Sequence, residues 1–235
     1  TINIGTDGAG NSLNTTVQLE GGVLAVQGGT VNLTLDNSAS YLQGNVITKS
    51  IEGMPAGTVN LTVTNGATWR PVYDNRYGDF TEKKTREVTD STGKTSTETY
   101  TVTRAPGYTV TENSIDTLTL KDGGIVDLTW DNPTRSSEFR TLSVGNLTGD
   151  NGVFKINADL ANNKADSISV GAGSASTQAY IDVAYDPYFA SETLSAGKSI
   201  TGKATVVTAS PTTMTFAGKQ HSYTPYTYTP TLVNN

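Results

Sequence analysis

The 235-residue sequence contains no cysteine and only one histidine. Without cysteine it can form neither a disulfide framework nor a thiolate metal site, and it offers no thiol nucleophile. No run approaches 18 apolar residues, so we expect no segment to cross a membrane as a helix. The 16 Lys and Arg are outnumbered by 22 Asp and Glu, which argues against a nucleic-acid partner, because phosphate binding needs a basic surface.

The first residue, Thr1, is followed by no charged stretch and apolar core of the kind that marks a signal peptide. We therefore expect that any targeting peptide has been removed, or that the chain is a piece of a larger protein. The length leaves room for one or two domains with a sizeable core.

Strand and turn residues dominate what the sequence does contain. It has 40 Thr, 24 Gly and 18 Asn, and Thr suits a pleated surface while Gly and Asn supply turns. Short segments alternate between apolar and polar residues, as at Val31, Leu33 and Leu35, and pairs such as Asn65-Gly66 separate them. This pattern predicts an all-β chain of short strands.

An internal repeat narrows the choice among all-β folds. Residues 29–41 read GTVNLTLDNSASY and residues 57–69 read GTVNLTVTNGATW, and this alignment pairs Tyr41 with Trp69. A weaker echo, DGGIVDLT, occupies residues 122–129. Repeats of this length are typical of stacked units, so we predict a right-handed parallel β-helix (a solenoid) in which Val31 lies over Val59. It is expected to make about nine turns, stacked about 4.8 Å apart.

Two later segments resemble a known family. Residues 118–128 read LTLKDGGIVDL, residues 139–154 read FRTLSVGNLTGDNGVF, and residues 165–170 read ADSISV. This succession is similar to the C-terminal passenger region of classical (type V) autotransporters, the pertactin-like autochaperone segment. The chain departs from the family pattern at Ile168, where Leu is usual, and at Thr177, where Gly is common.

The resemblance implies a β-helical passenger that is exported across the outer membrane of a Gram-negative-type bacterium and displayed at the cell surface or secreted. It also implies a translocator barrel following Asn235, and a role for this segment in templating passenger folding. As an adhesin-like passenger it would mediate attachment, aggregation or biofilm formation.

A charged insertion interrupts the repeats between residues 70 and 113. Residues 70–104 hold 7 Lys or Arg and 6 Asp or Glu, and two alternating runs, 80–89 and 95–104, flank a loop containing Gly93. This pattern predicts a protruding β-hairpin. It is either a binding arm, since displayed loops often carry recognition, or a solvated insertion whose mixed charges prevent edge aggregation. The candidate ligand-binding residues are Tyr73, Arg76, Tyr77, Phe80, Lys83, Lys84 and Arg86.

The sequence thus divides into four regions. Residues 1–69 are β-helix repeats, 70–113 the hairpin insertion, 114–185 the pertactin-like rungs and 186–235 a Tyr-rich C-terminal cap. The tyrosines of the last region, such as Tyr226 and Tyr228, are expected to close the open end of the stack. A sugar-stacking or self-association surface is the alternative.

Catalytic and metal-binding signatures are scarce. A catalytic triad would have to use His221, and neither a nucleophile elbow nor a calcium-binding loop occurs. We therefore predict no enzymatic activity, no metal and no cofactor. The partner is expected to be a host-cell or extracellular-matrix protein, a glycan, or a second passenger. The alternatives are a non-catalytic stem with an enzyme upstream, and a carbohydrate-active β-helix using carboxylates such as Asp127 and Asp131.

Overall fold

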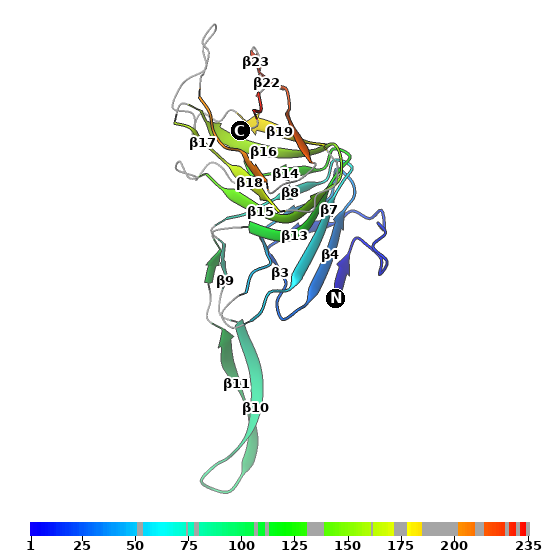
Figure 1. Ribbon diagram of the computed structural model, residues 1–235. Coiled ribbons are helices and arrows are strands. Elements are labelled where there is room, and N and C mark those ends of the chain that lie inside the picture. Colours follow the sequence, from blue (N-terminus) through cyan, green and yellow to red (C-terminus); the bar gives the residue numbers. More distant parts are fainter. Residues whose placement is uncertain are drawn as a thin grey trace. The chain divides into compact units, whose positions relative to one another are not determined.

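The computed structural model describes residues 1–50, 54–73, 75–77, 80–105, 108–110, 113–130, 139–160, 162–171, 178–184, 202–209, 214–223, 226–228 and 231–233. All regular structure in these ranges is β (Figure 1). Within the same ranges no helix is long and apolar enough to cross a membrane. The chain divides into two compact units, a solenoid unit of residues 1–73 with 112–235 and a hairpin unit of residues 74–111.

Two stacked parallel sheets form most of the solenoid unit. Sheet A contains, in spatial order, β1 (Ile2–Ile4), β4 (Thr30–Leu35), β7 (Thr58–Val63), β13 (Asn113–Leu120), β15 (Thr141–Thr148), β18 (Ser167–Val170) and β20 (Val207–Ala209). Sheet B contains β2 (Gln18–Glu20), β5 (Tyr41–Gln43), β8 (Thr68–Arg70), β14 (Ile125–Asp127), β16 (Gly152–Asp159), β19 (Gln178–Ala184) and β21 (Thr215–Gly218). Because successive strands of each sheet pair in parallel and in chain order, the predicted parallel β-helix is confirmed.

Smaller elements complete this unit. A third parallel pair joins β3 (Val23–Leu24) to β6 (Val46–Ile47). An antiparallel pair joins β17 (Lys164–Ala165) to β16, and another joins β22 (His221–Tyr223) to β23 (Tyr226–Tyr228).

The described residues form seven rungs, each with one strand in sheet A and one in sheet B, against the expected total of about nine. The repeat itself explains the smaller number. Asn32 and Asn60, which occupy equivalent places in adjacent rungs, are 28 residues apart. At that length per rung, the chain outside the insertion supplies seven rungs.

The repeat sets the pairing of β4 with β7. All six residues pair as the alignment predicts, from Thr30 with Thr58 to Leu35 with Val63, so Val31 lies beside Val59. On the outer face, Asn32 Nδ2 donates to Asn3 Oδ1 at 2.8 Å, and Asn60 Nδ2 donates to Asn32 Oδ1 at 2.9 Å. We expect this amide ladder to fix the register, because each side chain bonds to its counterpart in the preceding rung.

The alignment of Tyr41 with Trp69 is wrong. Tyr41 pairs with Thr68, and Trp69 pairs with Leu42, because the preceding turn is one residue shorter in the later rung. A one-residue slip moves a side chain to the opposite face of a strand. Trp69 is therefore buried in the core, whereas Tyr41 faces outward and its hydroxyl donates to Glu20 at 3.2 Å.

The weaker echo of the repeat, residues 122–129, does not lie in sheet A beside the segments that it resembles. Residues 125–127 form β14 in sheet B, where Val126 pairs with Trp69. The strand that continues the Asn-Leu-Thr column of sheet A is β13, whose Leu118 pairs with Leu61.

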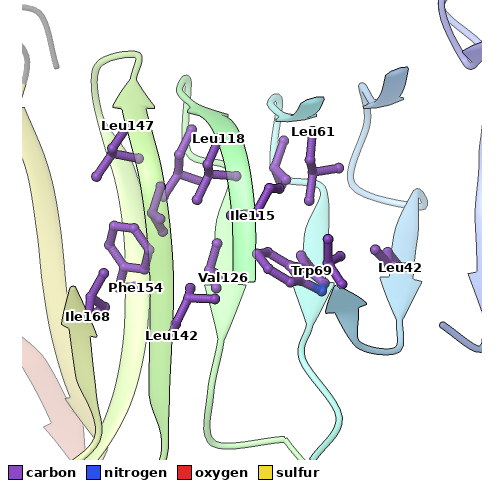
Figure 2. Close-up of a cluster of buried hydrophobic side chains, with 14 of the residues drawn as sticks. Leu42, Leu61, Trp69, Ile115, Leu118, Val126, Leu142, Leu147, Phe154 and Ile168 are labelled. Carbon is purple, nitrogen blue, oxygen red and sulfur yellow. The ribbon is translucent and has the colours of Figure 1, made fainter. Parts of the chain in front are cut away.

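The core consists of columns of apolar side chains between the two sheets. One column runs through Leu33, Leu61, Leu118 and Leu147 of sheet A, and a second through Leu42, Trp69, Val126 and Phe154 of sheet B. Figure 2 shows side chains of both columns in rows between the strands. Every one of these residues is 2% exposed or less, so each rung contributes buried area to its neighbours.

Glycine allows the rungs to approach closely at one turn. A Cβ atom on Gly44 would lie 1.6 Å from the Gly21 carbonyl oxygen of the preceding rung. The Gly44 carbonyl also accepts a hydrogen bond of 3.0 Å from the Trp69 indole. The turn thus supplies the partner that the only polar atom of this buried ring requires.

Candidate functional site

The hairpin unit is built on two long antiparallel strands. β10 (Phe80–Thr89) pairs with β11 (Thr95–Ala105), as the alternation predicted. The Asp90 carboxylate holds the turn by accepting hydrogen bonds from the Thr92 hydroxyl at 2.6 Å, the Thr92 amide at 2.8 Å and the Lys94 amide at 3.0 Å. These bonds lower the pKa of Asp90, the Thr92 hydroxyl most strongly. A second antiparallel pair, β9 (Asn75–Tyr77) with β12 (Tyr108–Val110), belongs to the same unit.

The alternation of strand residues gives this ribbon two different faces. One face carries eight threonines together with Lys83 and Glu87, and threonines oppose one another across the strands, as Thr85 opposes Thr99. The other face carries charged, aromatic and aliphatic groups, and the register places Tyr100 opposite Lys84. Between residues 81 and 103 no side chain is buried, so both faces are available to a partner.

The second face has an ordered cluster at its centre. Arg86 donates to Glu98 through Nε at 2.9 Å and forms an ion pair through Nη2 at 2.8 Å. The Arg86 guanidinium also lies 5.2 Å from the centre of the Tyr100 ring. An Arg beside an aromatic ring is common at interaction hot spots, but here the carboxylate of Glu98 already occupies part of its donor fork.

The candidate ligand-binding residues, which were expected to act together, lie on different faces and strands. Lys84 and Arg86 share the charged face, and Lys84 Nζ lies 3.9 Å from Glu82. Lys83 is on the threonine face, opposite Thr101. Arg76 lies on β9, paired with Thr109, and Tyr77 pairs with Tyr108.

Phe80 opens β10 and is followed by a shift in register. The side chains of Arg76, Tyr77 and Phe80 lie outside the described part of the chain. Their part in binding stays a prediction.

The remaining candidate, Tyr73, lies in the core of the solenoid unit and is 6% exposed. Its hydroxyl donates to the Thr141 carbonyl at 3.2 Å, and the Arg140 guanidinium lies 4.7 Å from its ring centre. Arg140 Nη1 in turn donates to the Trp130 carbonyl at 3.0 Å. Tyr73 thus belongs to a packed cluster that joins rungs, and the hairpin unit begins after it.

A buried carboxylate lies beside this cluster. Asp166, which is 0% exposed, accepts hydrogen bonds from the backbone amide of Arg140 at 2.7 Å and of Asn157 at 2.8 Å. The Asn157 side-chain amide donates to it at 3.1 Å. The ADSISV motif indicated this residue only as part of a resemblance. In the structure it holds together chain segments that lie before β15 and within β16.

Sequence reasoning missed an outward-facing cluster on sheet B. The Arg70 guanidinium lies 5.1 Å from the centre of the Tyr41 ring and 4.3 Å from that of Trp130. These residues come from separate rungs, and Trp130 is 37% exposed. Only the one-residue slip that turns Tyr41 outward makes this stack, so the aligned repeat alone could not reveal it.

A shallow groove of about 350 Å³ crosses the outer face of sheet A over Thr34, Thr62 and Thr119. Its carboxylates are engaged within the chain. Asp36 accepts from Asn65 Nδ2 at 2.6 Å and from the Ser12 hydroxyl, and Asp122 accepts from the Thr64 hydroxyl at 3.2 Å. The groove is therefore polar, and turn contacts explain its acidic groups.

The carboxylate pair considered for carbohydrate chemistry falls partly outside the described residues, because Asp131 is not among them. Asp127 accepts hydrogen bonds from the Thr129 amide at 3.0 Å and hydroxyl at 2.6 Å, which is the arrangement of a turn. Among the described residues no group of three or more His, Asp or Glu is placed to hold a metal ion. His221 lies on β22, but its side chain is not among those described.

Comparison with protein families gives a match in the later part of the chain. Residues 115–220 match the Pertactin family, and this region runs from within β13 to beyond β21. Comparisons with curated proteins and with solved structures find no match. The parallel rungs and the motif residues within them agree with this match, and residues 115–220 are therefore similar to the pertactin-like passenger region of autotransporters.

Proposed function

We propose that this chain is a segment of a surface-displayed autotransporter passenger that mediates attachment, either to a host-cell or matrix component or between passengers. The observation that carries the proposal is the match of residues 115–220 to the Pertactin family on a parallel β-helix. Passengers of this type are exported and are generally non-catalytic, which supports a binding role over an enzymatic one.

The hairpin unit supports the same proposal. It presents two exposed faces of different chemistry, and one of them carries an Arg, a Tyr and two carboxylates. Segments displayed on a regular scaffold are common places for recognition. The solenoid thus provides the scaffold in this proposal, and the hairpin provides the contact surface.

A contribution to passenger folding is the second part of the proposal. The matched region includes Asp166, whose buried carboxylate accepts hydrogen bonds from the backbone amides of Arg140, just before β15, and Asn157, within β16. We call this arrangement the Asp166 hub. Because buried backbone N–H groups need hydrogen-bond partners, the hydrogen bonds to Asp166 link the segments that contain Arg140 and Asn157. The later rungs can then serve as a template for the earlier ones.

The test displays the full passenger on a bacterium that does not otherwise adhere. Attachment to cells and matrix, and sedimentation of the culture by aggregation, are compared with and without the passenger. We expect displayed passenger to increase at least one of the two. If cells carrying it adhere and aggregate no more than cells lacking it, the proposal is wrong.

A matched variant locates the contact. Residues 74–111 are replaced by a short Gly-Ser linker, which leaves the buried Tyr73 in place. Far-ultraviolet circular dichroism of the purified chain checks that the rungs remain. Loss of attachment with retained rungs assigns the contact to the hairpin, and unchanged attachment assigns it to the solenoid.

A further inference from the structure

The hairpin unit contains a ribbon of only two strands. Within the described residues, β10 and β11 pair with each other and with no third strand. Each strand therefore has one edge whose backbone donors and acceptors lack a strand partner. Isolated two-stranded ribbons are marginally stable in water, and an added strand stabilises them.

The two open edges differ in how they are protected. β10 carries five charged residues between positions 81 and 89, including Lys83 and Lys84. β11 carries one, Glu98, between positions 95 and 103, where threonines alternate with Tyr100 and Val102. Charged side chains, lysine above all, are how proteins prevent pairing at an edge. By this measure β10 is protected, and β11 is open to pairing.

The composition of β11 also favours pairing. Its residues have high strand propensity, and the segment 95–103 contains neither proline nor glycine. Open segments of this kind readily accept another strand.

The charge of the hairpin permits two copies to approach. Residues 81–103 contain four basic and four acidic residues, so this ribbon is neutral while the whole chain has a net charge of −6. Neutral surfaces associate more readily than charged ones. Like copies therefore repel less at this ribbon than the net charge of the whole chain would suggest.

We propose that the open edge of β11 pairs with β11 of a second copy of this chain, antiparallel and about a two-fold axis, to give a four-stranded sheet. The proposal rests on the proposed function, because it names the partner as a second passenger. Main-chain hydrogen bonds would supply the affinity, as in other cases of strand addition. Display of many copies on one cell would add to it through multivalency.

The side chains suit one register in particular. With Thr101 on the two-fold axis, Tyr100 lies opposite Val102 of the second copy and Thr99 lies opposite its Thr103. Aromatic with β-branched pairs and Thr with Thr pairs are both favourable across strands. The same register places the two Glu98 carboxylates at opposite ends of the paired segment, so no like charges face each other. A symmetric contact must be self-complementary in this way.

The test measures self-association of the purified whole chain by sedimentation over a concentration series. The decisive variant is Thr101→Glu. Within one hairpin, position 101 opposes Lys83, so the new carboxylate has a positive partner there. Across the two-fold axis it would face the same carboxylate of the second copy. We expect the dissociation constant of the dimer to rise by about tenfold or more, since like charges directly opposite each other destabilise a strand pair. Added salt should restore part of the association.

Two further variants separate edge pairing from other causes. Thr85→Glu adds the same charge to β10, and we expect it to leave association unchanged. The double variant Lys83→Glu with Thr101→Lys keeps an opposite-charge pair within its hairpin. Alone, the double variant should associate as poorly as Thr101→Glu. Mixing the double variant with Thr101→Glu in equal amounts should give a heterodimer, because the two copies then carry opposite charges at position 101. Circular dichroism confirms that all variants keep their strands.

Several outcomes would overturn the inference. They are a monomeric unaltered chain at every concentration, an unchanged dimer in Thr101→Glu, equal weakening by Thr85→Glu, or no recovery on mixing. The readout uses no cells, so failure here leaves the adhesion proposal standing. A dimer in solution whose displayed form neither adheres nor aggregates would instead contradict the proposed function and leave the inference intact.

Discussion

The solenoid and the hairpin contain similar Thr-rich strands, but the strands are packed in the solenoid core and unburied in the hairpin. In β4 threonine and asparagine alternate with Val31, Leu33 and Leu35, and the apolar residues are buried. In β11 threonine alternates with mixed residues such as Glu98 and Tyr100, and no described side chain is buried. Thr content therefore predicts a strand in both regions. What decides whether a strand enters the stack is the residue between the threonines, because only an apolar one gains by burial.

The largest expected loss of stability comes from truncating a buried side chain of the solenoid. Trp69→Ala removes a ring that is 0% exposed and lies between Leu42 and Val126 in its column. We expect the free energy of unfolding to fall by about 3–5 kcal/mol, the usual cost of truncating a buried aromatic side chain. Urea unfolding followed by circular dichroism measures it.

Tyr100→Ala is the matched change in the hairpin. Because Tyr100 is exposed, the unfolding free energy should change by no more than about 0.5 kcal/mol. Equal losses in the two variants would contradict the contrast drawn between buried and unburied strands.

The next effect concerns the Asp166 hub. Asp166→Ala leaves the buried amides of Arg140 and Asn157 without this acceptor, and we expect a loss of about 2–4 kcal/mol from unsatisfied donors. The control is Asp127→Ala, whose carboxylate accepts from Thr129 in a turn, with an expected loss of about 1 kcal/mol or less. A hub variant as stable as its control would show that Asp166 does not hold the pertactin-like rungs together.

A smaller effect measures how strongly the hairpin is ordered by its own contacts. A double-mutant cycle of Arg86→Ala and Glu98→Ala should give a coupling of about 0.2–1 kcal/mol, since the pair is solvent-exposed. Nuclear magnetic resonance of the hairpin amides reports the population of the ribbon. A coupling of several kcal/mol would mean that this pair is far less hydrated than its exposure indicates.

The smallest effect is a pH dependence of the hairpin turn. The Thr92 and Lys94 donors lower the pKa of Asp90, so the ionised form favours the folded turn. Its contribution is complete above the usual aspartate pKa of about 3.9 and is lost as the pH falls through the lowered value. Amide shifts of Thr92 and Lys94 during an acid titration should report this loss. In Asp90→Asn, which keeps an acceptor but does not titrate there, the two shifts should lose this dependence.

The sequence predicted most of the architecture because the solenoid repeats itself. A strand whose neighbour has nearly the same sequence has its register set by matching residues, as in Thr30 to Leu35 with Thr58 to Val63. The hairpin was predicted equally well, since its turn chemistry is local.

What the sequence could not predict depended on the turns and on contacts between rungs. One residue fewer in a turn placed Trp69 inward and Tyr41 outward, and alignment without gaps cannot detect such a slip. The stack of Arg70 with Tyr41 and Trp130 follows from it. The burial of Tyr73 was hidden because its partner, Arg140, comes from a distant part of the chain.

The pairing of β7 with β13 has a practical consequence. Asn60 lies beside Thr117 although the whole hairpin unit intervenes in the chain between them. The pairing of β7 with β13 uses no residue of the hairpin unit, so we expect it to form whatever sequence stands between these strands. A position of this kind can accept foreign peptides, such as an epitope or an affinity tag, without altering the host protein's own pairing. The segment between residues 73 and 112 is accordingly where a foreign peptide could be inserted into this chain.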